Sequence, residues 1–168
     1  AMAIDKNKVK AFWDARAQKL NKVNFESIAN LEEDPRNLEL KIALETAKVF
    51  DYLGDVAGRS VVDIGAGVGQ WSFRFFERRA SWVTAVEYSA DLAEIGRKEA
   101  ARRNAHNVEF VVSPAEEYQA KRTYDIVFIS GLFVYMNDDQ AEKFAARLSA
   151  LCSPQTIVLL RDGTSILE

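Results

Sequence analysis

The chain has 168 residues, of which 48% are hydrophobic and 28% charged, so it has the composition of a globular protein large enough for one domain with a substantial core. Its formal net charge of −3 argues against a protein that binds the nucleic-acid backbone, which would need a basic face. One cysteine, Cys152, and one histidine, His106, exclude an internal disulfide and a metal site built from several such side chains.

No segment resembles a signal peptide or a membrane span. The longest apolar run, residues 126–136, is too short to cross a bilayer and contains a glycine. No basic, apolar and small-residue succession typical of a secretory leader is found. We therefore expect a cytoplasmic protein without metal ligands, membrane span or nucleic-acid partner.

Two helices are predicted before the first strand. Residues 5–20 carry apolar side chains at helical spacing, and residues 21–33 are mixed and are predicted as a loop. Asp34-Pro35 then starts a second helix, with Asp34 as its N-cap and Pro35 in its first turn. This helix is expected to reach about Leu53, before Gly54.

From residue 60 onward, strands alternate with helices. Strands are predicted at 60–64, 82–87, 108–112, 124–130 and 156–161, and helical segments at 68–79, 89–103, 115–118 and 137–151. This alternation predicts an α/β protein with a doubly wound, mostly parallel sheet and helices on both faces. The strand at 60–64 would be central, and a ligand would bind at the carboxyl ends of the strands, where the strand order reverses.

The most informative motif is the glycine-rich turn after the first strand. Dinucleotide-binding folds use G-x-G-x-x-G, but position 70, where the third glycine would fall, is Gln70. The pattern from Asp63 to Gly69, D-x-G-x-G-x-G, instead resembles motif I of the class I S-adenosylmethionine (SAM) dependent methyltransferases. The resemblance implies that Gly65, Ala66 and Gly67 pass beneath the amino-acid end of the cofactor, and that Asp63 faces its positive charges. A tight turn without a ligand is the alternative.

Glu87 ends the second strand, and Tyr88 follows it. An acidic side chain at this place can accept hydrogen bonds from both ribose hydroxyls, a device that NAD-binding folds share. Glu87 therefore indicates an adenosine ribose without choosing between cofactors, and Tyr88 is a candidate for the adenine face. An exposed glutamate at a strand end is the alternative.

The ends of the third and fourth strands extend the resemblance. The family often reads D-A-E after its third strand, whereas Pro114 stands here in place of the Asp, followed by Ala115 and Glu116. Ala115 keeps a backbone N–H for the adenine, and Ser113 or Glu116 is the candidate to replace the missing carboxylate. The pair Tyr124-Asp125, the apolar strand to Ser130 and the apolar residues Leu132 to Tyr135 resemble motif IV of the family. This resemblance implies that the carbonyl of Ser130 faces the methionyl ammonium and that Tyr135 projects toward the methyl group, while core packing is the alternative for residues 132–135.

The N-terminal helix resembles the Y-W-D-x-R helix that precedes the core of many small-molecule methyltransferases. The matching residues are Phe12-Trp13-Asp14-Ala15-Arg16. The resemblance implies a lid in which Trp13 covers the cofactor and Arg16 meets its carboxylate, while core packing is an equal alternative for Trp13. Residues 1–58 are thus expected to form a lid segment and residues 59–168 a SAM-binding core, within one structural domain. Trp71 is predicted to serve packing.

The resulting interpretation is SAM-dependent methyl transfer to a small-molecule or glycan acceptor by in-line displacement. Tyr135 and Asp162 are the candidate bases by position. The family continues past the fifth strand with further strands that this chain lacks. We therefore expect the chain to be either a piece of a longer polypeptide or a minimal form of the family. Its sequence does not define an oligomeric state. A catalytically silent SAM-binding subunit is the first alternative. An NAD(P)-linked oxidoreductase is less favoured, because Gln70 breaks the fingerprint and no Tyr-x-x-x-Lys motif occurs.

Overall fold

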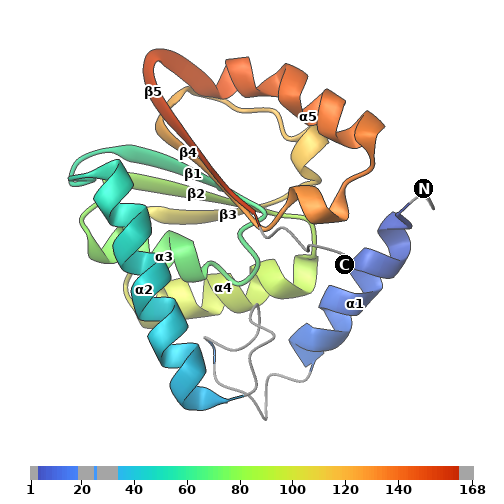
Figure 1. Cartoon of the computed structure of the whole chain (residues 1–168), viewed down its shortest axis with the longest axis horizontal. Coiled ribbons are helices and arrows are strands. Elements are labelled where there is room, and N and C mark those ends of the chain that lie inside the picture. The colour runs from blue at the N-terminus through green and yellow to red at the C-terminus, as the bar shows by residue number, and fades with distance from the viewer. Residues whose placement is uncertain (1–3, 19–24, 26–33, 163–168) are drawn as a thin grey trace, which may run out of the picture.

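A computed structural model of the chain describes residues 4–18, 25 and 34–162. Its strands are β1 (Ser60–Ile64), β2 (Trp82–Glu87), β3 (Val108–Val112), β4 (Tyr124–Ser130) and β5 (Cys152–Arg161). Its α-helices are α1 (Lys6–Gln18), α2 (Pro35–Leu53), α3 (Gln70–Glu77), α4 (Ala90–Arg102) and α5 (Asp138–Leu151), with short 3-10 turns η3 (Ala115–Glu117) and η4 (Phe133–Tyr135). Figure 1 shows α5 on one face of the sheet and α2, α3 and α4 on the other.

The five strands form one parallel sheet in the order β3-β2-β1-β4-β5. The central strand β1 pairs with β2 through Val61 and Val83, and with β4 through Val61 and Ile126. The predicted doubly wound sheet is therefore confirmed. The strand order reverses at β1, so the crevice between β1 and β4 opens at their carboxyl ends.

The core has two halves, one on each face of the sheet, because successive side chains of a strand point to opposite sides. In β4, Phe128 packs with Phe73 and Phe75 of α3 on the face that also receives α2. Its neighbour Ile129 packs with Phe144 of α5 on the opposite face. Residues 126–129 of β4 are buried on both faces of the sheet, which explains their continuous apolar sequence.

The predicted starts of α2, α4 and α5 are confirmed by their caps. The side chain of Asp34 accepts a hydrogen bond from the backbone N–H of Arg36 at 2.8 Å, and Ser89 accepts one from Leu92 at 3.3 Å. Asn137 and Gln140 form a reciprocal capping box at the start of α5. These ends follow from local side-chain chemistry, which is why sequence patterns located them.

Two predicted element starts differ by two or more residues from the structure. The helix after the glycine turn begins at Gln70 rather than at residue 68, because Gly67 and Gly69 have φ values of 58° and 88° and extend the turn. Strand β5 begins at Cys152 rather than at residue 156, directly after α5, and its pairing with β4 is irregular near Tyr124. The loop predicted at 21–33 lies outside the described residues except for Phe25.

Candidate functional site

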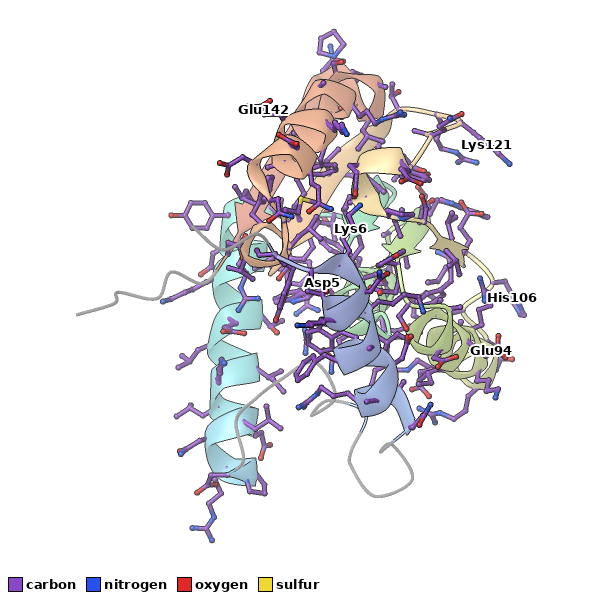
Figure 2. The ribbon with its side chains drawn as sticks, turned by 90° about the vertical axis from the view of Figure 1, so that its right-hand side faces the viewer. Asp5, Lys6, Glu94, His106, Lys121 and Glu142 are labelled. Carbon is purple, nitrogen blue, oxygen red and sulfur yellow. The ribbon has the colours of Figure 1, made fainter. Side chains whose placement is uncertain are left out.

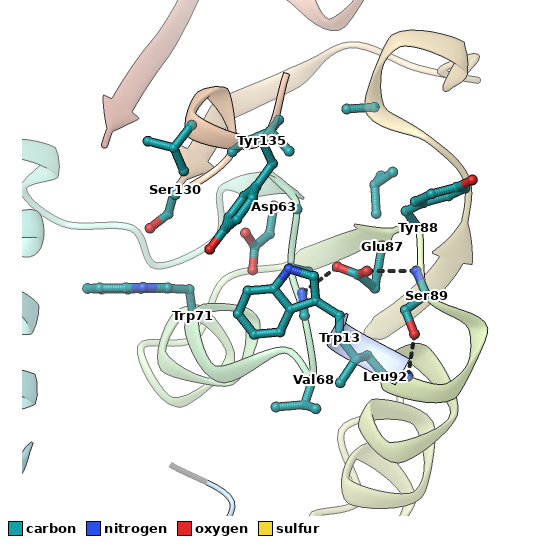
Figure 3. Close-up of a pocket in the computed structure, with 18 of the residues that line it drawn as sticks. Trp13, Asp63, Val68, Trp71, Glu87, Tyr88, Ser89, Leu92, Ser130 and Tyr135 are labelled. Carbon is teal, nitrogen blue, oxygen red and sulfur yellow. Dashed lines mark hydrogen bonds between the residues drawn. The ribbon is translucent and has the colours of Figure 1, made fainter. Parts of the chain in front are cut away.

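A cavity of ≈ 360 Å³ lies at the carboxyl ends of β1, β2 and β4, where the strand order predicts a ligand. Its walls come from distant parts of the chain: Trp13 of α1, Gly67 of the glycine turn, Glu87 at the end of β2 and Tyr135 of η4. Figure 3 shows the two aromatic rings and the acidic side chains Asp63 and Glu87 around this space.

The glycine turn is tied to β2 by its backbone. The N–H groups of Gly65 and Ala66 both donate to the carbonyl of Val86, at 2.9 and 3.0 Å. At Gly67 no atom lies within 4 Å of the place that a Cβ would take, whereas a Cβ at Gly69 would lie 2.5 Å from the ring of Phe110. Gly67 therefore leaves open space beside the cavity, and Gly69 allows the turn to pack on the core.

Glu87 joins the glycine turn to the start of α4 through the two oxygens of its carboxylate. Oε2 accepts a hydrogen bond from the N–H of Gly67 at 2.8 Å, and Oε1 accepts one from the N–H of Ser89 at 2.7 Å. Burial raises the pKa of Glu87, and these backbone hydrogen bonds partly oppose the rise. An exposed strand-end glutamate is thus excluded, because the side chain is only 9% exposed and shapes the turn.

Asp63 places a second carboxyl group in the cavity wall. It is buried and accepts a hydrogen bond from the hydroxyl of Ser72 at 2.7 Å. The pKa of Asp63 is raised to about 7, mainly by burial and also by the charge of Glu87, while the hydrogen bond from Ser72 opposes the rise. Two acidic groups near each other in a buried site favour a ligand that brings positive charge or hydrogen-bond donors.

Helix α1 lies beside the cavity and is fixed to the core near both of its ends. The backbone N–H and C=O of Ile4 bond to the side chain of Asn137 at 2.7 and 2.9 Å. Toward the other end, Asp14 accepts a hydrogen bond from Ser89, the N-cap of α4. Figure 2 shows α1 nearest the viewer, alongside α4, with Lys6 near its first turn.

An aromatic pair covers part of the cavity. The rings of Trp13 and Tyr135 meet edge to face, with centroids 5.9 Å apart. Trp13 also packs near Val68 and Leu92, so it lines the cavity and belongs to a small apolar cluster at once. Packing is therefore confirmed for Trp13, and its role as a cover over the cofactor stays a prediction.

The cavity reaches the end of β3, where the D-A-E pattern is broken. Pro114, Ala115 and Glu116 line it there. Glu116 is buried, forms an ion pair with Lys6 of α1 and accepts a hydrogen bond from Gln140 at 3.2 Å. Its carboxylate thus joins α1 and α5 to η3 as well as lining the cavity.

Tyr135 and Asp162, the candidate bases, both lie in the cavity wall. Oδ2 of Asp162 accepts a hydrogen bond from the N–H of Phe133 at 2.9 Å, while its Oδ1 is buried without a hydrogen-bond partner among the described residues. Burial raises the pKa of Tyr135 and the charge of Asp162 raises it further, while the charge of Arg16 partly opposes the rise. A phenol that keeps its proton is a poor base at neutral pH, so Asp162 is the better candidate.

All but one of the site residues predicted from the sequence line the same cavity. The cavity is lined by Trp13, Asp63, Gly65, Ala66, Gly67, Glu87, Tyr88, Pro114, Ala115, Glu116, Ser130, Tyr135 and Asp162. Arg16 is not among its lining residues; its guanidinium lies 5.9 Å from the ring centroid of Phe12.

Sequence reasoning missed one side of the cavity, next to α2. Trp71, predicted to serve packing alone, contacts the ring of Phe128 at 5.1 Å between centroids and also lines the cavity. Arg74 and Arg161 lie in the same wall, 4.5 and 5.4 Å from the centroid of Trp71. The place of Arg161 at the end of the fifth strand was the available signal, since the carboxyl ends of parallel strands share one edge of the sheet.

Within the described ranges, no helix combines the length and apolarity needed to cross a bilayer. The same residues contain no group of three or more His, Cys, Asp or Glu arranged to hold a metal ion.

The chain is similar to known methyltransferases in sequence. A family model described as a methyltransferase domain matches residues 61–155. Phosphoethanolamine N-methyltransferase 1 of Triticum aestivum is 23% identical over 164 residues, which are 95% of this chain and 31% of that protein. (S)-Coclaurine N-methyltransferase of Thalictrum flavum subsp. glaucum is 30% identical over 100 residues, 59% of this chain and 26% of that protein.

A solved structure gives the same picture of the fold. Phosphoethanolamine N-methyltransferase 1 of Haemonchus contortus, in complex with phosphoethanolamine and S-adenosylhomocysteine, matches with a TM-score of 0.79 at 24% identity. The match covers 95% of this chain and 32% of that one, and the chain likewise spans only 31% of the length of the curated phosphoethanolamine N-methyltransferases. Because the family model covers more than half of its residues, the chain belongs to the methyltransferase domain family.

Proposed function

We propose that the chain is the SAM-binding core of a methyltransferase that acts on a small-molecule amine. The observation that supports this proposal is the turn at Gly67, which leaves open space beside the cavity. Two buried acidic side chains, Asp63 and Glu87, line the same cavity. A cytoplasmic location and a function inside a longer polypeptide are parts of the same proposal.

The residues present fit this cofactor better than a dinucleotide. A pyrophosphate is an anion and would meet the carboxyl groups of Asp63 and Glu87 in a buried wall, which is unfavourable. A methionyl ammonium and a sulfonium are cations and would be stabilised by the same groups. The two carboxyl groups beside the glycine turn therefore support SAM over NAD(P), in line with Gln70 at the place of the third fingerprint glycine.

When bound, SAM supplies a methyl group on a positively charged sulfur, which a nucleophile displaces in line. The protein's contribution is alignment and the exclusion of water. In this proposal Glu87 accepts hydrogen bonds from the ribose, Asp63 and the carbonyl of Ser130 face the ammonium, and the Trp13–Tyr135 pair covers the reacting groups.

An amine acceptor is supported by the relatives, which are named as N-methyltransferases of phosphoethanolamine and of coclaurine. We prefer it to the glycan that the sequence left open. Amines are mostly protonated at neutral pH and must lose a proton before they attack carbon. Asp162, with Oδ1 lacking a partner in the described residues, is the group we propose to accept that proton, with the Tyr135 hydroxyl as a hydrogen-bond donor beside it.

We further propose that the lid is helix α1 alone. Its polar contacts to the core lie near its ends, at Ile4, Lys6 and Asp14. Its apolar contacts lie in a small cluster that contains Trp13 and is separate from the main core. Helix α2 instead places Val49 and Leu53 in the core beside α3, which ties it to the sheet. The lid segment expected over residues 1–58 is thereby narrowed to its first helix.

The experiment that tests the cofactor is thermal unfolding of the chain with SAM, S-adenosylhomocysteine or NAD added in turn. A ligand that binds only the native state raises the unfolding temperature. We expect stabilisation by the first two and none by NAD; stabilisation by NAD alone would refute the proposal. Transfer of a labelled methyl group to a panel of small amines then separates an active enzyme from the silent partner subunit, which would bind the cofactor without turnover.

A further inference from the structure

The wall of the cavity next to α2 contains an arginine that the sequence did not nominate. The guanidinium of Arg161, at the end of β5, donates from Nη1 to the hydroxyl of Ser130 at 3.0 Å. Its Nη2 lies 2.5 Å from a carboxylate oxygen of Glu45 of α2. Ser130 ends the neighbouring strand β4, so sheet pairing places these two side chains side by side. The guanidinium is therefore fixed at the edge of the cavity from two elements.

Arg161 keeps the capacity to bind an anion in this position. A guanidinium has five N–H donors in a planar fork that suits a carboxylate. The contacts to Ser130 and Glu45 engage one N–H from each terminal nitrogen. The side chain is 34% exposed, so its remaining donors are not sealed in the core.

The surroundings of Arg161 match the two charges of an α-amino acid. Such a group carries an ammonium and a carboxylate on one carbon, so it needs acceptors and donors within a few ångströms of each other. Asp63 provides a carboxyl group on this side of the cavity, close enough to Arg74 for the charge of that arginine to lower the Asp63 pKa. Arg74 and Arg161 both approach Trp71, so acidic and basic groups alternate along one wall.

We propose that Arg161, positioned by Glu45, binds the carboxylate of the amino-acid end of SAM, a role that the family resemblance would give to Arg16. Arg16 does not line the cavity, whereas Arg161 does and contacts Ser130 directly. The inference rests on the proposed function, since it assigns a binding residue for the same cofactor. It adds that α2, through Glu45, takes part in cofactor recognition although it lies outside the parallel sheet.

The test compares two ligands that differ at the amino-acid end. S-Adenosylhomocysteine carries the ammonium and the carboxylate, and 5′-methylthioadenosine lacks both while keeping the adenosine and the sulfur. Calorimetric titration of the full chain is carried out with each ligand, for the parent, Arg161→Gln and Arg16→Gln. Lys48→Gln serves as a control, because Lys48 is an exposed cation of the same helix as Glu45 and does not line the cavity.

We expect Arg161→Gln to weaken S-adenosylhomocysteine at least about tenfold, because one hydrogen bond to a charged group exceeds the free energy of one decade in affinity. Methylthioadenosine should stay within about twofold of the parent, a change well short of a decade. Arg161→Lys should recover part of the loss, and the control should bind both ligands as the parent does. The double variant Glu45→Gln/Arg161→Gln, which leaves no unpaired carboxylate, should show the same selective loss if Arg161→Gln alone folds poorly.

Three outcomes would overturn the inference. These are unchanged S-adenosylhomocysteine binding in the folded Arg161→Gln protein, an equal loss for both ligands, or a selective loss in Arg16→Gln instead. Failure of the parent to bind S-adenosylhomocysteine would remove the proposed function itself, and this inference with it. Normal binding by the parent with unaffected variants would remove only the role of Arg161.

Discussion

Replacement of Glu87 tests the site at the residue that joins the glycine turn to the start of α4. Its carboxylate accepts hydrogen bonds from the N–H groups of Gly67 and Ser89, at 2.8 and 2.7 Å, and is proposed to accept the ribose hydroxyls as well. The Glu87→Ala protein loses all of these contacts and leaves two backbone donors without their acceptor. We therefore expect this substitution to affect both cofactor binding and the stability of the glycine turn.

The magnitudes follow from the contacts. Each hydrogen bond to a charged group contributes about 1.5–3 kcal/mol, but the raised pKa of Glu87 indicates that burying its charge has a cost that offsets part of this. We expect the free energy of unfolding to fall by about 1–3 kcal/mol. For a domain of this size, each kcal/mol lowers the unfolding temperature by about 2–4 °C. Affinity for S-adenosylhomocysteine should fall at least about tenfold.

The assay combines thermal unfolding with calorimetric titration of S-adenosylhomocysteine. Glu87→Gln should lose less than Glu87→Ala, because the amide oxygen can still accept one hydrogen bond while its NH₂ group faces the other donor. Glu94→Ala is the control, since Glu94 is exposed and its ion pairs with Arg97 and Lys98 contribute little. If folded Glu87→Ala binds within about twofold of the parent, far less than one decade, the ribose lies elsewhere and the assigned site is wrong.

Three further predictions concern the same cavity. Gly67→Val should abolish S-adenosylhomocysteine binding in calorimetry while the protein stays folded, because its side chain would enter open space at a φ of 58°; normal binding would make the turn purely structural. Gly69→Ala should instead lower the unfolding temperature, since its Cβ would lie 2.5 Å from Phe110. Because burial raises the pKa of Asp63 from 3.8 to about 7, the stability that its protonated form contributes should be present in acid and lost as the pH rises through about 7, whereas affinity for a cationic amino group should increase from about pH 6 to about pH 8. Denaturant melts from about pH 4 to about pH 8 and ligand titrations from about pH 6 to about pH 8 check the two trends, and Asp63→Asn should flatten both. Asp162→Asn should lower methyl transfer to an amine at least about tenfold in a labelled-methyl assay while S-adenosylhomocysteine binding is retained, a result that unchanged turnover would contradict.

The amino-acid sequence by itself determined the succession of elements and the cofactor loop. Apolar runs, caps such as Asp34 and Ser89, and the Asp63–Gly69 pattern act over a few neighbouring residues, so they can be read along the chain. The central position of β1 followed from the alternation of strands and helices, and the structure confirms it. The sequence alone therefore places the residues at the carboxyl ends of β1, β2 and β4 in one site.

Only the tertiary structure decided which side chains meet across that site. The contact of Arg161 with Ser130 and Glu45 joins β5, β4 and α2, and no local pattern relates residues so far apart in the chain. The burial of Glu87 depends on the turn folding back onto β2, and the placement of Arg16 outside the cavity depends on how α1 docks. Local sequence fixes which groups stand at a strand end, whereas packing of distant elements fixes their partners, their burial and hence their pKa values.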